Sequence, residues 1–112
     1  MMTALQQQHR VCAVAEISAD SVGSGELPDG RRVAIYNVGG SFYASDDACT
    51  HGKASLSEEG TLEGCVIECG LHFGSFDVRT GAVVSSPCTL PLRTYPVQIR
   101  DGQVWLDVGA EA

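Results

Sequence analysis

Cys49-Thr50-His51 and Cys69-Gly70-Leu71-His72 are the two segments that decide the fold of this 112-residue chain. They spell C-x-H and C-x-x-H, and residues 52–68 separate them. Two of the three histidines therefore stand close to two of the five cysteines, each pair in a Gly-containing segment beside an expected strand. Thiolates and imidazoles are common metal ligands. The pattern predicts a metal site made of two cysteines and two histidines: Cys49, His51, Cys69 and His72.

Two other interpretations of these residues are open. A Cys₂His₂ zinc site usually places both cysteines on one knuckle and both histidines on another, whereas each segment here is mixed. Core cysteines beside surface histidines are the second alternative, and the matching offsets in two separate segments disfavour it. His9, in the polar N-terminal segment, is expected to have no role in the site.

The rest of the chain predicts a mostly β structure. Val, Ile and Tyr recur in short runs separated by Gly-containing turns, and no stretch keeps the 3.6-residue period of an amphipathic helix. The acidic segment 45–64 predicts a long loop, and so does the proline-containing segment 85–92. The expected strands are residues 10–17, 32–38, 41–44, 65–68, 75–78, 82–84, 93–100 and 103–108, with tight turns at 27–30, 39–40 and 101–102.

Length and composition limit the classes of function. The chain fits one domain, residues 1–112, with residues 1–9 as a flexible tail. A net charge of −7 disfavours nucleic acid and anionic membranes as partners. Residues 1–10 contain no apolar signal-peptide core, and no run of about 18 apolar residues occurs, so a cytoplasmic protein is expected. An odd number of cysteines also makes a disulfide framework a weak interpretation.

The two ligand segments resemble the signature of Rieske [2Fe–2S] proteins. The resemblance extends over residues 11–108 and includes His72-Phe73-Gly74-Ser75-Phe76-Asp77, which is similar to ferredoxins of aromatic-ring dioxygenases. It implies a small all-β domain of antiparallel sheets, with two ligand loops at one end around a [2Fe–2S] cluster. Cys49 and Cys69 would bind one iron, and His51 and His72 the other. Residues 87–91 resemble the proline loop that covers the cluster in this family.

Two departures separate the chain from the high-potential Rieske proteins. Those proteins have an additional cysteine in each ligand loop, joined as a disulfide, and neither loop has one here. They also place Ser and Tyr hydroxyls near the cluster sulfurs, where this chain has Gly74 and Phe76. Hydrogen bonds to sulfur stabilise the more negative reduced state, so the expected potential is low, roughly −150 mV.

The remaining cysteines, Cys12, Cys65 and Cys88, are expected to be buried or half-buried thiols. Cys65 lies on an expected strand, and recruiting it as a ligand would distort that strand. Cys88, next to Pro87, could approach the cluster, although the structural role is preferred.

The resemblance implies a monomeric one-electron carrier and no enzyme activity in this chain alone. A NAD(P)H-dependent flavoprotein reductase would supply electrons, and a Rieske non-haem iron oxygenase would consume them in aromatic hydrocarbon catabolism. After the cluster is built only His9 remains, which leaves no 2-His-1-carboxylate site. The alternatives are a Rieske-like small subunit of a nitrite reductase, which would have lost the ligands, and one of an arsenite oxidase, which would need an export signal.

The acidic residues are concentrated around the ligand segments. Residues 46–68 contain one base, Lys53, and six acids, so five of the seven net negative charges lie there. The acids are Asp46, Asp47, Glu58, Glu59, Glu63 and Glu68. A solvated acidic loop is the simplest explanation. We favour steering of basic partners instead, because an electron carrier needs fast encounters and complementary charge accelerates association.

Overall fold

The chain folds into antiparallel β-sheets, which confirms the fold class expected from the sequence. The computed structural model describes residues 8–50, 54–70, 74–85 and 90–108. Within them the three sheets have the strand orders β1-β11-β10, β2-β3-β4-β9 and β5-β6-β7-β8. The strands are β1 (Gln8–Ala13), β2 (Ser21–Glu26), β3 (Arg32–Val38), β4 (Ser41–Asp46), β5 (Thr61–Glu63), β6 (Val66–Glu68), β7 (Ser75–Asp77), β8 (Val83–Ser85), β9 (Thr94–Tyr95), β10 (Val97–Arg100) and β11 (Gln103–Asp107). The helical segments are the 3-10 turn η1 (Val14–Glu16) and the helix α2 (Leu56–Glu59).

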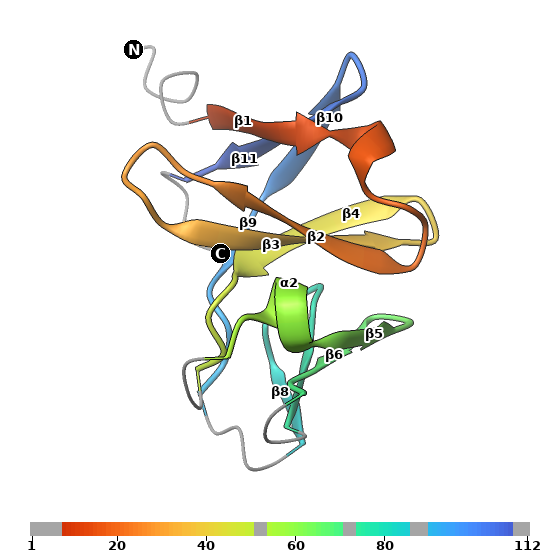
Figure 1. Ribbon diagram of the computed structural model, residues 1–112, viewed down its shortest axis with the longest axis vertical. Helices are drawn as coiled ribbons and strands as arrows, with labels where there is room; N and C mark the ends of the chain where they lie inside the picture. Colours follow the sequence, from red (N-terminus) through yellow and green to blue (C-terminus); the bar gives the residue numbers. More distant parts are fainter. Residues whose placement is uncertain (1–7, 51–53, 71–73, 86–89, 109–112) are drawn as a thin grey trace.

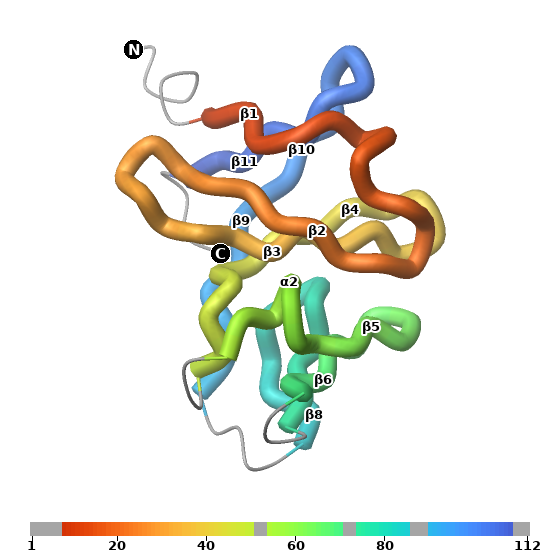
Figure 2. Tube along the Cα trace, viewed as in Figure 1, coloured from red at the N-terminus to blue at the C-terminus, as the bar shows by residue number. Residues whose placement is uncertain are grey.

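The sheets form two parts stacked along the long axis of the molecule (Figure 1). The sheets that contain β1 and β3 make the upper part, and the β5–β8 sheet with α2 makes the lower part. The chain passes down after β4 and returns to pair with it at β9 (Figure 2). At this crossing the Asp46 N–H donates to the Arg93 carbonyl oxygen over 2.9 Å.

Strand β3 connects the two hydrophobic cores. Successive side chains of a strand point to opposite faces of its sheet. Val33 and Ile35 belong to the upper core, whereas Ala34 and Tyr36 belong to the lower one. Because both faces are covered, the strand is an almost continuous buried run, and none of these four side chains is exposed.

The two predicted hairpins are confirmed. Gly39 and Gly40 connect β3 to β4, and Asp101 and Gly102 connect β10 to β11. All four residues have positive φ, as the two-residue hairpin turns that match strand twist require. The predicted turn at 27–30 is also present, with the Gly30 N–H donating to the Leu27 carbonyl oxygen.

The predicted long loop over residues 45–64 is wrong. It contains the end of β4, helix α2 and strand β5. Ser55 caps α2, because its side chain accepts a hydrogen bond from the Glu58 N–H, and Leu56 is fully buried in the lower core. A helix of four residues is too short to produce a periodic pattern in the sequence, which is why the segment resembled a loop.

Several strand boundaries also differ from the prediction. The predicted strand 10–17 starts earlier, at Gln8, so Gln8 and His9 lie in β1 rather than in a tail, and it ends where η1 begins. The predicted strand 93–100 is divided at Pro96, which cannot donate a ladder hydrogen bond. Strand β2 was not predicted, since Gly23 and Gly25 weaken its strand pattern.

No helix among the described residues is long and apolar enough to cross a membrane.

Candidate metal centre

Cys49 and Cys69 are both buried in the hydrophobic core of the lower part of the molecule. Cys49 is 2% exposed and Cys69 is 0% exposed. Both belong to the lower core, together with Tyr36, Leu56 and Phe76. One thiol follows β4 and the other follows β6, so segments 20 residues apart in sequence meet at this core. Both cysteines therefore contribute to one core, and their role as metal ligands stays a prediction.

Each of these cysteines begins a loop that is closed by the same kind of hydrogen bond. The Cys49 N–H donates to the Ala54 carbonyl oxygen over 3.0 Å, and the Cys69 N–H donates to the Gly74 carbonyl oxygen over 2.8 Å. In both cases the acceptor lies five residues after the cysteine. An antiparallel bridge between Ala48 and Ser55 extends the first closure, and the β6–β7 pairing extends the second. Both thiols are thus fixed at the start of a tightly closed loop.

The two predicted histidine ligands, His51 and His72, lie outside the described residues, as does Cys88. Among the residues that the structure describes, no three or more His, Cys, Asp or Glu side chains gather as metal ligands. The structure therefore describes the burial and backbone of the two cysteines, and the four-ligand site of Cys49, His51, Cys69 and His72 stays a prediction.

Gly70 allows the second loop to approach helix α2. A Cβ atom at this position would lie 2.1 Å from the Glu59 carbonyl oxygen. Real Cβ atoms do not approach a backbone oxygen so closely, and backbone cannot move aside as a flexible side chain can. The residue that follows Cys69 must therefore be glycine in this arrangement.

The first loop is also tied to the proline-containing segment. The Thr50 hydroxyl donates to the Leu90 carbonyl oxygen over 2.7 Å. Leu92, two residues later, is buried in the lower core, whereas the Leu90 side chain is 62% exposed. The segment predicted to cover the cluster therefore lies beside the first loop at residue 90, and residues 86–89 lie outside the described part. The contact between Thr50 and Leu90 was not predictable from the sequence, because no local pattern relates residues 40 positions apart.

Two pairs of hydroxyls in the described part of the chain are bonded to each other. Ser75 and Ser85 share a hydrogen bond of 2.7 Å, and the Tyr36 and Ser45 hydroxyls share one of 2.8 Å. The Ser45 hydroxyl also donates to the Asp46 carbonyl oxygen, so Tyr36 is the donor to Ser45. Burial raises the pKa of Tyr36, which keeps this donor protonated. Gly74 and Phe76, where high-potential relatives have hydroxyls, are buried and contribute none.

One of the six acidic residues between positions 46 and 68 does not lie on the surface, so the acidic segment is not solvated throughout. Glu58, Glu59, Glu63 and Glu68 are exposed, and Asp46 is half-buried. Asp47 is only 4% exposed. Asp47 was therefore misassigned to the acidic surface, and its environment differs from that of the four glutamates.

The crossing between the two parts is held by a polar cluster. The Tyr95 hydroxyl donates to Asp46 Oδ1 over 2.5 Å and accepts from Arg31 Nη1 over 3.1 Å. Burial and, after it, the hydrogen bond to Asp46 raise the pKa of Tyr95 to about 12. The phenol therefore stays protonated and keeps donating at neutral pH, which fixes the segment that leads into the first loop.

The prediction for the other described cysteines is confirmed. Cys12 is 5% exposed in the upper core, and burial, with the charge of Glu16, raises the pKa of its thiol. Cys65 is half-buried and packs against the lower core. The Cys65 carbonyl oxygen accepts the Val78 N–H over 2.8 Å, which favours a structural role.

Comparison with protein families gives one match over most of the chain. The family described as the Rieske [2Fe-2S] domain matches residues 7–96. The ferredoxin component of the p-cumate 2,3-dioxygenase system of Pseudomonas putida is 48% identical over 100 residues, covering 89% of this chain and 85% of that protein. The biphenyl dioxygenase ferredoxin subunit of Pseudomonas sp. strain KKS102 is 48% identical over 99 residues, covering 85% of this chain and 91% of that protein.

Solved structures show the same similarity. The complex of reduced oxygenase and oxidized ferredoxin in carbazole 1,9a-dioxygenase contains a chain with a TM-score of 0.86 and 43% identity, with coverage of 96% of this chain and 97% of that chain. The Sphingomonas yanoikuyae B1 ferredoxin has a TM-score of 0.84 and 41% identity, with coverage of 89% of this chain and 97% of that chain. The similarity includes both parts of the fold.

Proposed function

This chain belongs to the Rieske [2Fe–2S] domain family, and from that premise we propose that it is the ferredoxin component of a multicomponent aromatic-ring dioxygenase system. It carries single electrons and is not itself an enzyme. One [2Fe–2S] cluster is bound by two cysteines and two histidines: Cys49, His51, Cys69 and His72. We assign residues 1–112 to one domain.

The observation that supports the proposal most directly is the placement of the two thiols. Cys49 and Cys69 are buried in one core, and each opens a loop closed by the same hydrogen bond. In Rieske centres two thiolates bind one iron and two imidazoles bind the other. The described residues fit this group, because two buried thiols from different loops belong to one core and each loop includes one of the predicted histidines.

The cluster, when bound, supplies reversible one-electron chemistry. The protein binds it through thiolates whose surroundings are apolar. Leu56, Phe76 and Leu92 are buried in the same core as the two cysteines and keep water out of it. The closed loops hold the two cysteines at fixed positions, so gaining or losing an electron requires little movement of the chain.

The partners in this proposal are a terminal oxygenase and a reductase. Curated relatives are ferredoxin components of dioxygenase systems, and one similar structure is a complex of ferredoxin with its oxygenase. We assign electron supply to a NAD(P)H-dependent flavoprotein reductase and place the protein, as a monomer, in the cytoplasm. Both partners would meet the ligand loops, and the exposed glutamates Glu58, Glu59, Glu63 and Glu68 would attract their basic residues.

The test is spectroscopic. The purified chain should show the visible absorption of a [2Fe–2S] protein and, after reduction with dithionite, an EPR signal with the low average g-value of mixed His and Cys ligation. Cys69→Ser should lose both signals, whereas the matched variant Cys65→Ser should keep them. A colourless protein after anaerobic reconstitution with iron and sulfide would contradict the proposal, and so would loss of the signals in Cys65→Ser alone.

A further inference from the structure

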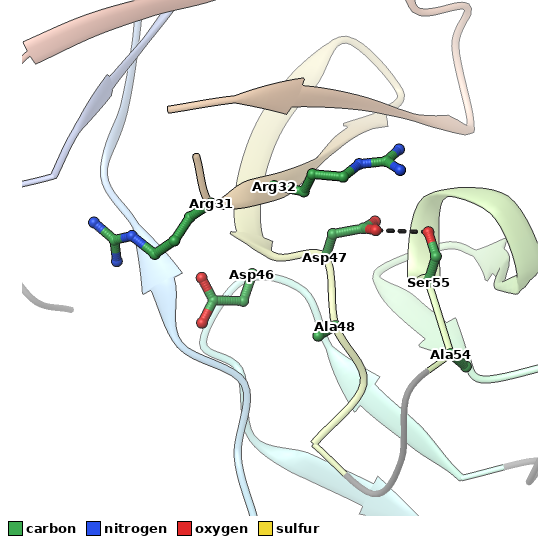
Figure 3. A pocket seen from close by; sticks show the side chains of 7 residues that line it. All are labelled: Arg31, Arg32, Asp46, Asp47, Ala48, Ala54 and Ser55. Atoms are coloured by element: carbon green, nitrogen blue, oxygen red, sulfur yellow. Dashed lines mark hydrogen bonds between the residues drawn. The ribbon is translucent and has the colours of Figure 1, made fainter. Parts of the chain in front are cut away.

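Asp47 is a buried carboxylate two residues before Cys49. Its side chain is 4% exposed. Oδ2 accepts the Ser55 hydroxyl over 2.6 Å, and Oδ1 accepts the Ser57 N–H over 2.8 Å. Figure 3 shows the carboxylate facing Ser55 across the base of the first ligand loop. Both oxygens are therefore occupied by donors from the chain that returns from this loop.

The backbone of Asp47 is fixed as firmly as its side chain. Its N–H donates to the Arg32 carbonyl oxygen over 3.1 Å, and its carbonyl oxygen accepts the Leu56 N–H over 2.8 Å. Asp47 is thus joined to β3 on one side and to α2 on the other. The carboxylate has a defined position relative to Cys49, because Ala48 is the only residue between them and is itself paired with Ser55.

The negative charge of Asp47 has no ion-pair partner among the described residues. Arg31 and Arg32 line the same pocket of about 420 Å³ as Asp47, and Figure 3 shows the Arg31 side chain pointing away from the Asp47 carboxylate. Arg31, however, pairs with Asp29 over 2.8 Å, and Arg32 pairs with Glu58 over 3.2 Å. Three of the four polar contacts that hold Asp47 are to neutral groups at the start of α2. A buried anion usually has a cation or a metal as partner, so one held only by neutral donors needs an explanation.

We propose that Asp47 is a positioning residue whose fixed charge lowers the reduction potential of the cluster beside Cys49. This inference rests on the proposed cluster site. Reduction adds one electron, and therefore one negative charge, next to a carboxylate that water screens poorly. Like charges repel more strongly in a protein interior than in water, so the reduced form is destabilised. No proton or bond changes, and the electron comes from the reductant used.

A purely structural role for Asp47 makes a different prediction. In that case its hydrogen bond to Ser55 would matter, and removing either partner would disturb the loop in the same way. A role for the charge separates the two partners. Asp47→Asn removes the charge and keeps the shape. Ser55→Ala keeps the charge and removes the hydroxyl that donates to it, together with the cap of α2.

The experiment is a redox titration followed by EPR, on the unmodified chain and three variants. Asp47→Asn should raise the midpoint potential. The expected rise corresponds to an equilibrium constant for reduction that is about fourfold larger or more, as Coulomb's law gives for charges about 10 Å apart at an effective dielectric constant of about 40. Ser55→Ala should leave the potential unchanged or lower it. Asp101→Asn, the matched loss of charge in the β10–β11 turn of the upper part, should leave it unchanged.

A potential of Asp47→Asn equal to that of Asp101→Asn would overturn the inference, and so would a rise in Ser55→Ala. If Asp47→Asn does not retain the cluster, the direction of the Ser55→Ala shift decides alone. A carboxylate that has lost one neutralising donor lowers the potential or leaves it unchanged, so a rise would contradict a role for the charge. Absence of the EPR signal from the unmodified chain would instead contradict the cluster site itself. The two failures are therefore distinguishable.

Discussion

At the scale of single residues, the surroundings of the two buried thiols predict a low reduction potential. Gly74 and Phe76 contribute no hydroxyl, and the hydroxyl of Ser75 between them is bonded to Ser85. Gly74→Ser would add a donor at the position where high-potential Rieske proteins have one. One hydrogen bond contributes about 1 kcal/mol, and a tenfold change is about 59 mV for one electron, so we expect a rise of roughly 40 mV in a redox titration.

Ser75→Ala is the control for this prediction. It removes the hydroxyl of the neighbouring residue. This hydroxyl is bonded to Ser85, so the potential should not change. An unchanged potential in Gly74→Ser, with an intact cluster signal, would show that the missing hydroxyl donor does not explain the low potential expected for this chain.

The same scale shows what sequence patterns can assign. Cys49 and Cys69 were singled out because the chemistry of metal ligands restricts residue type and spacing, and the structure shows that both are buried in one core. Asp47 was grouped with the surface acids, because sequence alone does not distinguish a solvated carboxylate from one buried against Ser55 and Ser57. Burial of a polar group depends on tertiary contacts, and these are not local in sequence.

At the scale of elements, close packing between the second loop and α2 explains a glycine. Gly70 meets the Glu59 carbonyl oxygen, so Gly70→Ala must displace backbone in α2 or in the loop. Overpacking of this kind costs typically 1–3 kcal/mol, and we expect about 3 kcal/mol with faster loss of the cluster during thermal unfolding. Circular dichroism and visible absorption, recorded together, measure both.

Gly64→Ala is the comparison for this clash. Gly64 has φ of 58° and nothing within 4 Å of an added Cβ. The substitution therefore causes no clash. It introduces backbone strain of about 1 kcal/mol in the turn between β5 and β6. Equal destabilisation by the two variants, with equal cluster retention, would contradict the importance of the contact between Gly70 and α2.

Elements were predicted from sequence where a local rule determines them. The hairpins at Gly39-Gly40 and Asp101-Gly102 were correct because their turns require positive φ. Helix α2 was missed because its stability comes from the Ser55 cap and the burial of Leu56. Strand β2 was missed because its glycines are explained only by the partners they face, Ile17 at Gly23 and Val11 at Gly25.

At the scale of the whole molecule, the upper and lower parts of the protein are expected to have different roles. The lower part has the two thiols and four exposed glutamates, Glu58, Glu59, Glu63 and Glu68, whereas the upper part packs its own core around β3 and exposes Glu16 and Glu26. An asymmetric distribution of charge steers a partner toward one end of a molecule. Electron transfer to a reductase or an oxygenase should therefore depend on the charge of the lower part and not on net charge alone.

Stopped-flow electron transfer at different salt concentrations measures this dependence. The Debye length falls from about 30 Å at 0.01 M to about 3 Å at 1 M ionic strength, so the second-order rate constant should fall by about tenfold or more across this range. Glu63→Gln combined with Glu68→Gln should lower the rate at low salt and flatten the salt dependence, because both side chains are exposed on β5 and β6. Asp101→Asn, in the upper part, should leave the rate nearly unchanged. A rate that is insensitive to salt, or equal effects of removing charge at the two ends, would contradict steering and leave the exposed glutamates as a solvated surface.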